Sequence, residues 1–264
     1  MKKCFICDLS AETMEDIIPK WLLNKFDLWN LKMKLPNQTP IFYSKLKISC
    51  CNKCNNEVLS VLENKVSKNI ATEYEIWMWA HKIHYGLTYK DKMLRWDRKT
   101  PKENIGDIIK RNDPYKLDKL FLKCLTNEFF TIPKPYGSVF KFSFSIPQPF
   151  FFAHLLATTS ICISVGEYGY IVFINDGQTL KVESGIYSFY EKLSINPTLE
   201  NMIFFYANCV EMMARHKLQS NFQFCDNYLI KNEEARVLEA KPVNKTRLTN
   251  LCREFGLNWI DLEL

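Results

Sequence analysis

The sequence is poor in glycine and histidine, with only 8 and 4 of its 264 residues. It contains neither G-x-G-x-x-G nor G-x-x-x-x-G-K-[ST], the loops that let backbone amides approach a phosphate, which argues against nucleotide-loop enzymes. No Ser/His/Asp order suggests nucleophilic catalysis. The longest apolar stretch, 149–165, starts with a proline and contains His154. It therefore predicts a buried strand and no membrane-spanning helix.

The N-terminus also lacks the apolar run of a secretory signal, although it carries Lys2 and Lys3. We therefore expect a cytoplasmic protein whose ten cysteines are reduced. In that compartment, closely spaced cysteines indicate metal binding rather than disulfides.

Positive charge is concentrated in the first half of the chain. Residues 1–123 carry a net charge of +8 and residues 124–264 carry −2. A basic N-terminal half suggests a polyanionic partner such as nucleic acid, whereas charge alone would fit an ordinary solvated surface equally well.

Two C-x-x-C pairs, Cys4/Cys7 and Cys51/Cys54, supply the four thiolates of a tetrahedral structural zinc site. The spacing of 43 residues between the pairs is longer than that of a simple zinc ribbon, but strands or a helix can fill such a gap. Cys50 could replace Cys51 as a ligand, although only Cys51 has the two-residue spacing to Cys54. The remaining cysteines lie singly in apolar patterns and are expected to be buried: Cys124, Cys162, Cys209, Cys225 and Cys252.

Two further motifs accompany the first cysteine pair. One lies between the pairs and reads Glu15-Asp16-Ile17-Ile18-Pro19-Lys20-Trp21-Leu22. The other is the second pair with the two asparagines that follow it, Cys51-x-x-Cys54-Asn55-Asn56. Together with the first C-x-x-C, this order resembles the zinc-supported HNH endonucleases over about residues 1–65. The resemblance implies a ββα-metal (His-Me finger) module, in which two strands and a helix hold one divalent cation against the scissile phosphate.

The resemblance also implies roles by position. Asp16 stands where the family most often has the histidine that acts as general base, Glu15 matches the preceding acidic residue, and Asn55 matches the last metal-ligating position. An aspartate titrates near ~3.9 and an imidazole near ~6.5, so Asp16 would be a poor base. With Glu15 it would instead ligate Mg²⁺ or Mn²⁺, and a metal-bound hydroxide could then attack. Leu46 occupies the position of the family's middle asparagine.

Two further sets of residues bear on this hypothesis. His81 and His84 lie three apart on an expected helix and could supply the imidazole missing at position 16, or could simply pack. Lysines around the motifs would neutralise nucleic-acid phosphates: Lys20, Lys45, Lys47 and Lys53.

The predicted fold class is α+β. We expect an HNH-like zinc module with its following helix over 1–88, a charged helical connection over 89–135, and a larger mixed α+β domain over 136–264. Gly86 marks the expected end of the long helix. Asp176-Gly177 is a hairpin signal, and a strand is expected at 179–183.

The predicted function is that of a metal-dependent endonuclease that hydrolyses phosphodiester bonds in DNA, and the resemblance makes a restriction or phage-defence role plausible. The alternative is a catalytically inactive HNH-like zinc protein that serves as a nucleic-acid-binding or assembly subunit. A third possibility is a protein-interaction module with a purely structural zinc. The C-terminal domain would select the target or a protein partner.

Overall fold

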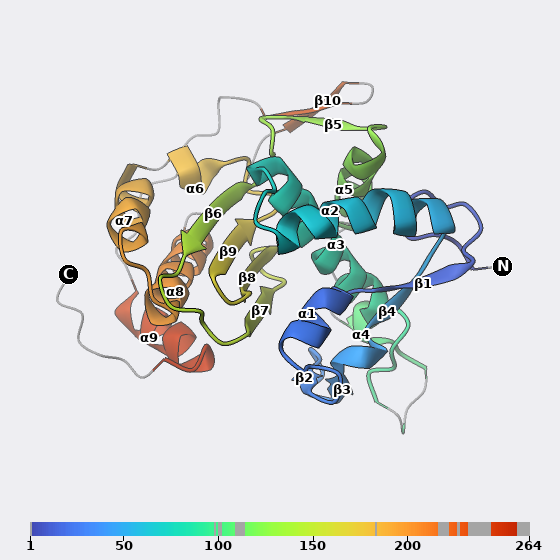
Figure 1. Cartoon of the computed structure of the whole chain (residues 1–264), viewed down its shortest axis with the longest axis horizontal. Helices are drawn as coiled ribbons and strands as arrows, with labels where there is room; N and C mark the ends of the chain where they lie inside the picture. Colours follow the sequence, from blue (N-terminus) through green and yellow to red (C-terminus); the bar gives the residue numbers. More distant parts are fainter. Residues whose placement is uncertain are drawn as a thin grey trace. The chain divides into compact units, whose positions relative to one another are not determined.

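The computed structural model describes residues 2–97, 99, 102–108, 114–182, 184–215, 222–225, 228–231 and 244–257 (Figure 1). The chain divides into two compact units, Met1–Phe130 (unit 1) and Thr131–Leu264 (unit 2). Helices and strands occur in both units, so the predicted α+β class is confirmed. None of the described helices is long and apolar enough to cross a membrane.

Unit 1 contains both cysteine pairs and is built from short strands and longer helices. In chain order its elements are β1 (Thr13–Asp16), α1 (Lys20–Lys25), β2 (Lys32–Lys34), β3 (Pro40–Phe42), η1 (Tyr43–Lys45), β4 (Lys47–Cys50), η2 (Cys54–Leu59), α2 (Ser60–Ser67), α3 (Glu73–Asp91), α4 (Ile105–Ile108), α5 (Pro114–Leu122) and η3 (Lys123–Thr126). Strands β1 and β4 pair antiparallel with Thr13 opposite Cys50, and β2 pairs with β3. The β1–β4 ribbon therefore brings the two cysteine pairs to the same region.

The helical segment after the second cysteine pair breaks before α3. Thr72 caps α3 because its side chain accepts a hydrogen bond from the Glu75 amide, and the Glu75 carboxylate accepts one from the Thr72 amide in return. The predicted end at Gly86 was wrong, since α3 continues to Asp91. A Cβ at Gly86 would lie 2.9 Å from Ile17 Cγ2. Glycine here permits close packing against the residue after β1 and does not end the helix.

Unit 2 is organised around a four-stranded antiparallel sheet in the order β6-β9-β8-β7. Its elements are β5 (Phe130–Ile132), β6 (Ser138–Ser143), β7 (Phe151–Leu155), β8 (Ser160–Ser164), β9 (Tyr168–Phe173), α6 (Thr179–Val182), α7 (Ser184–Ser194), α8 (Leu199–Arg215), β10 (Phe222–Cys225), β11 (Tyr228–Lys231) and α9 (Lys245–Glu254). Alternating residues of β6 form the core with α8, as in the edge-to-face contacts of Phe140 and Phe142 with Phe205.

The strand predicted at 179–183 was wrong, because Thr179–Val182 forms α6; residue 183 lies outside the described residues. Asp176 explains the difference. Its buried carboxylate accepts hydrogen bonds from the Ser138 amide at 2.8 Å, from Ser138 Oγ at 2.6 Å and from the Leu180 amide at 3.1 Å. An Asp-Gly pair that resembles a hairpin turn in the sequence thus starts a helical turn.

Candidate metal centre and its polar neighbours

The four cysteines of the two C-x-x-C pairs converge. The Sγ atoms of Cys4, Cys7, Cys51 and Cys54 all lie within 4.8 Å of one another. Three of these side chains are buried and Cys7 is half-buried. Such a group could hold a metal ion such as zinc, because soft thiolates at this separation match tetrahedral coordination. The predicted ligand set therefore fits the metal.

Cys50 lies next to this group without belonging to it. It ends β4, with its Sγ 3.9 Å from Cys4 Sγ. The contact between Cys4 and Cys50 is the main cause that lowers the pKa of Cys4 and the main cause that raises the pKa of Cys50. These opposite directions favour Cys4 as the thiolate and Cys50 as the thiol that donates to it. Outside this region four of the five single cysteines are buried, as expected: Cys124, Cys162, Cys209 and Cys252. The side chain of Cys225 lies outside the described residues.

Adjacent cysteines 50 and 51 offer a matched pair of variants. We expect Cys51→Ala to lose most of its zinc, because a three-thiolate site leaves one coordination position to water. Cys50→Ala is expected to retain about one zinc ion per chain, since it removes only a supporting donor. Metal analysis of the two purified variants checks this. Equal zinc loss in both would show that the spacing rule chose the wrong ligand.

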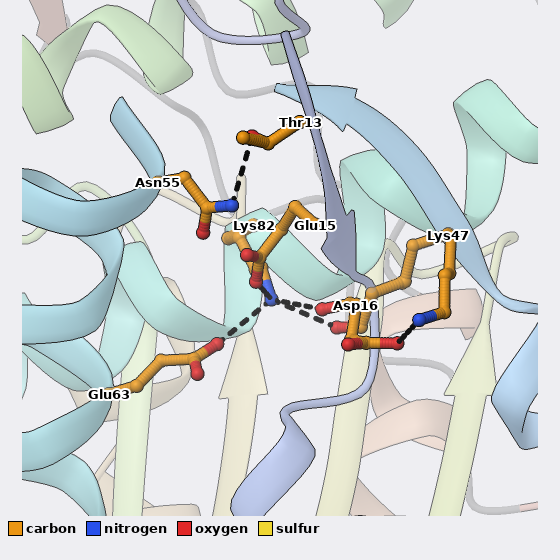
Figure 2. A network of polar contacts seen from close by, with 8 residues as sticks. Thr13, Glu15, Asp16, Lys47, Asn55, Glu63 and Lys82 are labelled. Atoms are coloured by element: carbon orange, nitrogen blue, oxygen red, sulfur yellow. Dashed lines mark hydrogen bonds and ion pairs between the residues drawn. The ribbon is translucent and has the colours of Figure 1, made fainter. Parts of the chain in front are cut away.

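A buried lysine dominates the polar contacts between β1 and the helices. Lys82 of α3 is only 1% exposed, and its Nζ lies 2.5 Å from Glu15 Oε1 and 2.9 Å from Glu63 Oε1. It also donates to the backbone oxygen of Asp16 at 2.6 Å and to that of Ile17 at 3.3 Å. Figure 2 shows the ammonium between the two carboxylates and the end of β1. Lys82 thus ties α3 to β1 and to α2.

The charges in this network support one another. Burial opposes the positive form of Lys82, but Glu63 and Glu15 outweigh it and raise the pKa of the ammonium above its usual value. Burial raises the pKa of Glu63, with the Lys82 charge acting in the opposite direction. Each buried ion therefore depends on its partners, because an isolated charge in such a site is costly.

The three residues predicted to act on a divalent cation do not meet at one point. Glu15 is engaged by Lys82. The Asp16 carboxylate lies 3.2 Å from the Nζ of Lys47, its partner across the ribbon. Successive residues of a strand point to opposite faces, which separates these two carboxylates. Asn55 Nδ2 donates to Thr13 Oγ1 at 3.1 Å (Figure 2).

The oxygens at this position do not fit Mg²⁺ or Mn²⁺. Such a cation needs several free oxygen ligands around it. Those that converge here, from Glu15, Glu63 and the Asp16 backbone, already surround the Lys82 ammonium. Across the described parts of the chain, the cysteine group is the one set of three or more Cys, His, Asp or Glu side chains positioned for an ion.

The predicted nucleic-acid lysines differ in their surroundings. Lys20, Lys45 and Lys53 are exposed on three separate segments of unit 1: the start of α1, η1 and the residue before η2. Lys47 is partly buried and pairs with Asp16. Three of the four therefore present their charge to solvent.

His81 and His84 do not supply an imidazole to Asp16. Both are buried against Asp118 of α5, with His84 Nε2 at 3.4 Å from Asp118 Oδ2 and His81 Nε2 at 3.8 Å from Oδ1. Burial lowers the pKa of His81. The His81 ring also stacks on Trp77, with centroids 6.0 Å apart. The packing alternative therefore describes these histidines.

Comparison with known proteins found no match. No protein-family model, no curated protein and no solved structure matches the chain. The function is therefore inferred from the geometry of the site.

Proposed function

We propose that the chain is a zinc-supported, HNH-like protein that binds nucleic acid, and DNA in the first instance, without hydrolysing it. The observation that carries this proposal is the position of Lys82. Its ammonium engages the carboxylate of Glu15, one of the predicted cation ligands, together with that of Glu63. A second cation on the same carboxylates would face the buried ammonium at short range, where repulsion is strong.

The topology supports the HNH-like part of the proposal. The antiparallel β1–β4 ribbon is followed by a helical segment, η2 and α2, and the cysteine group lies where the ribbon and this segment meet. Two strands and a helix in this order are what the resemblance implies. The zinc would supply structural stability by closing both knuckles.

The lysines supply the affinity. Lys20, Lys45 and Lys53 are exposed cations on the same unit as the ribbon. Such side chains bind phosphates and release counterions, which gives salt-sensitive affinity with little dependence on base sequence.

A binding assay on a short DNA duplex tests this proposal. We expect the logarithm of the binding constant to fall linearly with the logarithm of salt concentration. The variant Lys20→Gln/Lys45→Gln/Lys53→Gln should reduce that slope by about 2 to 3. Fluorescence anisotropy at several salt concentrations measures it.

The matched control removes the same charge from exposed lysines of unit 2. Lys134→Gln/Lys192→Gln/Lys245→Gln should leave the slope close to that of the wild type. Equal loss in both triple variants would show that net charge alone causes binding. Absence of salt-sensitive binding in the zinc-loaded wild type would favour the protein-interaction module.

A metal-dependent endonuclease is the second candidate. The observation in its favour is the place of Asp16, which is the last residue of β1 and follows Glu15. The resemblance assigns this position to the general base. In this alternative the site would recruit Mg²⁺ or Mn²⁺, and a restriction or phage-defence role would follow. A target-selecting or partner-binding role of unit 2 belongs to both candidates.

A further inference from the structure

Unit 1 contains a pocket of about 630 Å³ next to the first cysteine pair, Cys4/Cys7. Three segments line it: residues around the first cysteine pair from Lys3 to Asp8, the C-terminal half of α3 with Lys92 directly after it, and α5 with the start of η3. The volume lies in the range of pockets that bind small molecules. No residue of this pocket belongs to the Lys82 network.

Aromatic rings form one wall of the pocket. Phe5 stacks on Tyr85 with centroids 6.4 Å apart, and Tyr85 stacks on Tyr89 at 5.9 Å. Tyr85 is buried, whereas Tyr89 is half-buried at the outer end of this column. Tyr85 and Tyr89 are four residues apart on α3 and therefore share a face of that helix. A further planar ring stacked on Tyr89 would continue this column.

Positive charge surrounds this aromatic wall. The pocket is lined by four lysines and one aspartate, a net charge of +3: Lys3, Lys92, Lys119, Lys123 and Asp8. Lys119 is held in place because its Nζ donates to the Phe5 backbone oxygen at 2.7 Å and to Asp8 Oδ1 at 3.0 Å. Lys3, Lys92 and Lys123 come from the three different segments. An anionic group in the pocket would therefore be approached from several sides.

We propose that this pocket binds a nucleoside monophosphate group, with the base stacked on Tyr89 and the phosphate near Lys92 and Lys123. Stacking on an aromatic side chain and attraction of a phosphate by lysine are the two contributions that hold an unpaired nucleotide. The inference rests on the proposed function in one respect, because the group could belong to the end of a bound strand. A free mononucleotide has the same chemistry.

The test compares four probes by isothermal titration of the zinc-loaded protein: AMP, adenosine, inorganic phosphate and a single-stranded oligonucleotide with a 5′-phosphate. We expect AMP to bind at least about tenfold more tightly than adenosine or phosphate, because only AMP offers both groups. Tighter binding of the oligonucleotide than of AMP that is lost in Tyr89→Leu would identify a strand end as the source, because binding to the lysines outside the pocket does not depend on Tyr89. Equal affinity would identify the free nucleotide.

Two variants and a control locate the binding. Tyr89→Leu should weaken AMP binding by about tenfold, and Lys123→Gln should weaken it several-fold at low salt. Lys68→Gln, an exposed lysine outside the pocket, should change nothing. Zinc content and the unfolding midpoint of each variant verify that it is folded.

Two results would overturn the proposal. One is AMP binding no tighter than that of inorganic phosphate, and the other is unchanged affinity in both pocket variants. Duplex binding measured on the same samples separates this inference from the proposed function. Duplex binding without AMP binding refutes the pocket alone, whereas AMP binding without duplex binding refutes the proposed function alone.

Discussion

Replacing Lys82 with methionine is expected to destabilise unit 1 by about 3–5 kcal/mol, the typical cost when one partner of a buried ion pair is removed. Methionine has a similar length and keeps the apolar contacts of the lysine stem, but it leaves the carboxylates of Glu15 and Glu63 without their cation. Tryptophan fluorescence during urea unfolding can report this change. Five of the six tryptophans lie in unit 1: Trp21, Trp29, Trp77, Trp79 and Trp96.

Two further variants show whether the loss comes from the buried charges. Lys65 also pairs with a carboxylate, Glu75, but its side chain is 42% exposed. Lys65→Met should therefore cost less than about 1 kcal/mol. Lys82→Met/Glu15→Gln/Glu63→Gln should recover most of the stability, because no unpaired charge remains in the site. Wild-type stability of Lys82→Met would show that the network does not hold α3 to the ribbon.

Removing zinc is expected to have the other large effect. Binding at structural four-ligand sites contributes about 10–16 kcal/mol in zinc-finger peptides, and it is coupled to folding. The two C-x-x-C pairs lie at opposite ends of a segment that contains α1 and the strand pairs β1–β4 and β2–β3. A zinc ion bound by both pairs would therefore tie the two ends of this segment together. We expect a chelator to accelerate amide exchange in β1, β4 and η2. Unit 2 has its own core around Phe140 and Phe205 and should keep its protection.

Hydrogen exchange followed by mass spectrometry measures both units in one experiment. Added zinc should restore protection in unit 1, and a chelator already saturated with zinc should have no effect. Metal analysis must first show that the chelator has removed the zinc. If amide exchange in unit 1 is then unchanged, a structural role for the four cysteines is contradicted.

The sequence allowed the group of four cysteines to be predicted because its signal is local. Each C-x-x-C pair sets the geometry of one knuckle, and the requirement for four thiolates joins the two pairs. The apolar pattern also predicts helices over 198–217 and 245–254, and α8 and α9 lie within these ranges.

The Lys82 network was not predicted, because its partners are distant in the sequence. Lys82 lies three residues after Trp79 and four before Gly86, both of them buried, so helical spacing places it on a packed face. A charge on such a face requires a buried counter-charge. That signal was present in the sequence, but nothing local identified Glu15 and Glu63 as the partners. The roles of Asp16, Glu15 and Asn55 in cleavage stay predictions.

A plasmid-nicking assay on zinc-loaded protein with Mg²⁺ or Mn²⁺ decides whether the protein binds DNA without cleaving it. The same preparation is first shown to bind the plasmid, and Asp16→Ala is assayed beside the wild type. We predict that both proteins bind and that both leave the plasmid supercoiled, because Lys82 engages the Glu15 carboxylate and Lys47 the Asp16 carboxylate that would ligate a catalytic cation. Cation-dependent nicking by the wild type that is lost in Asp16→Ala would refute the proposed function and establish the endonuclease.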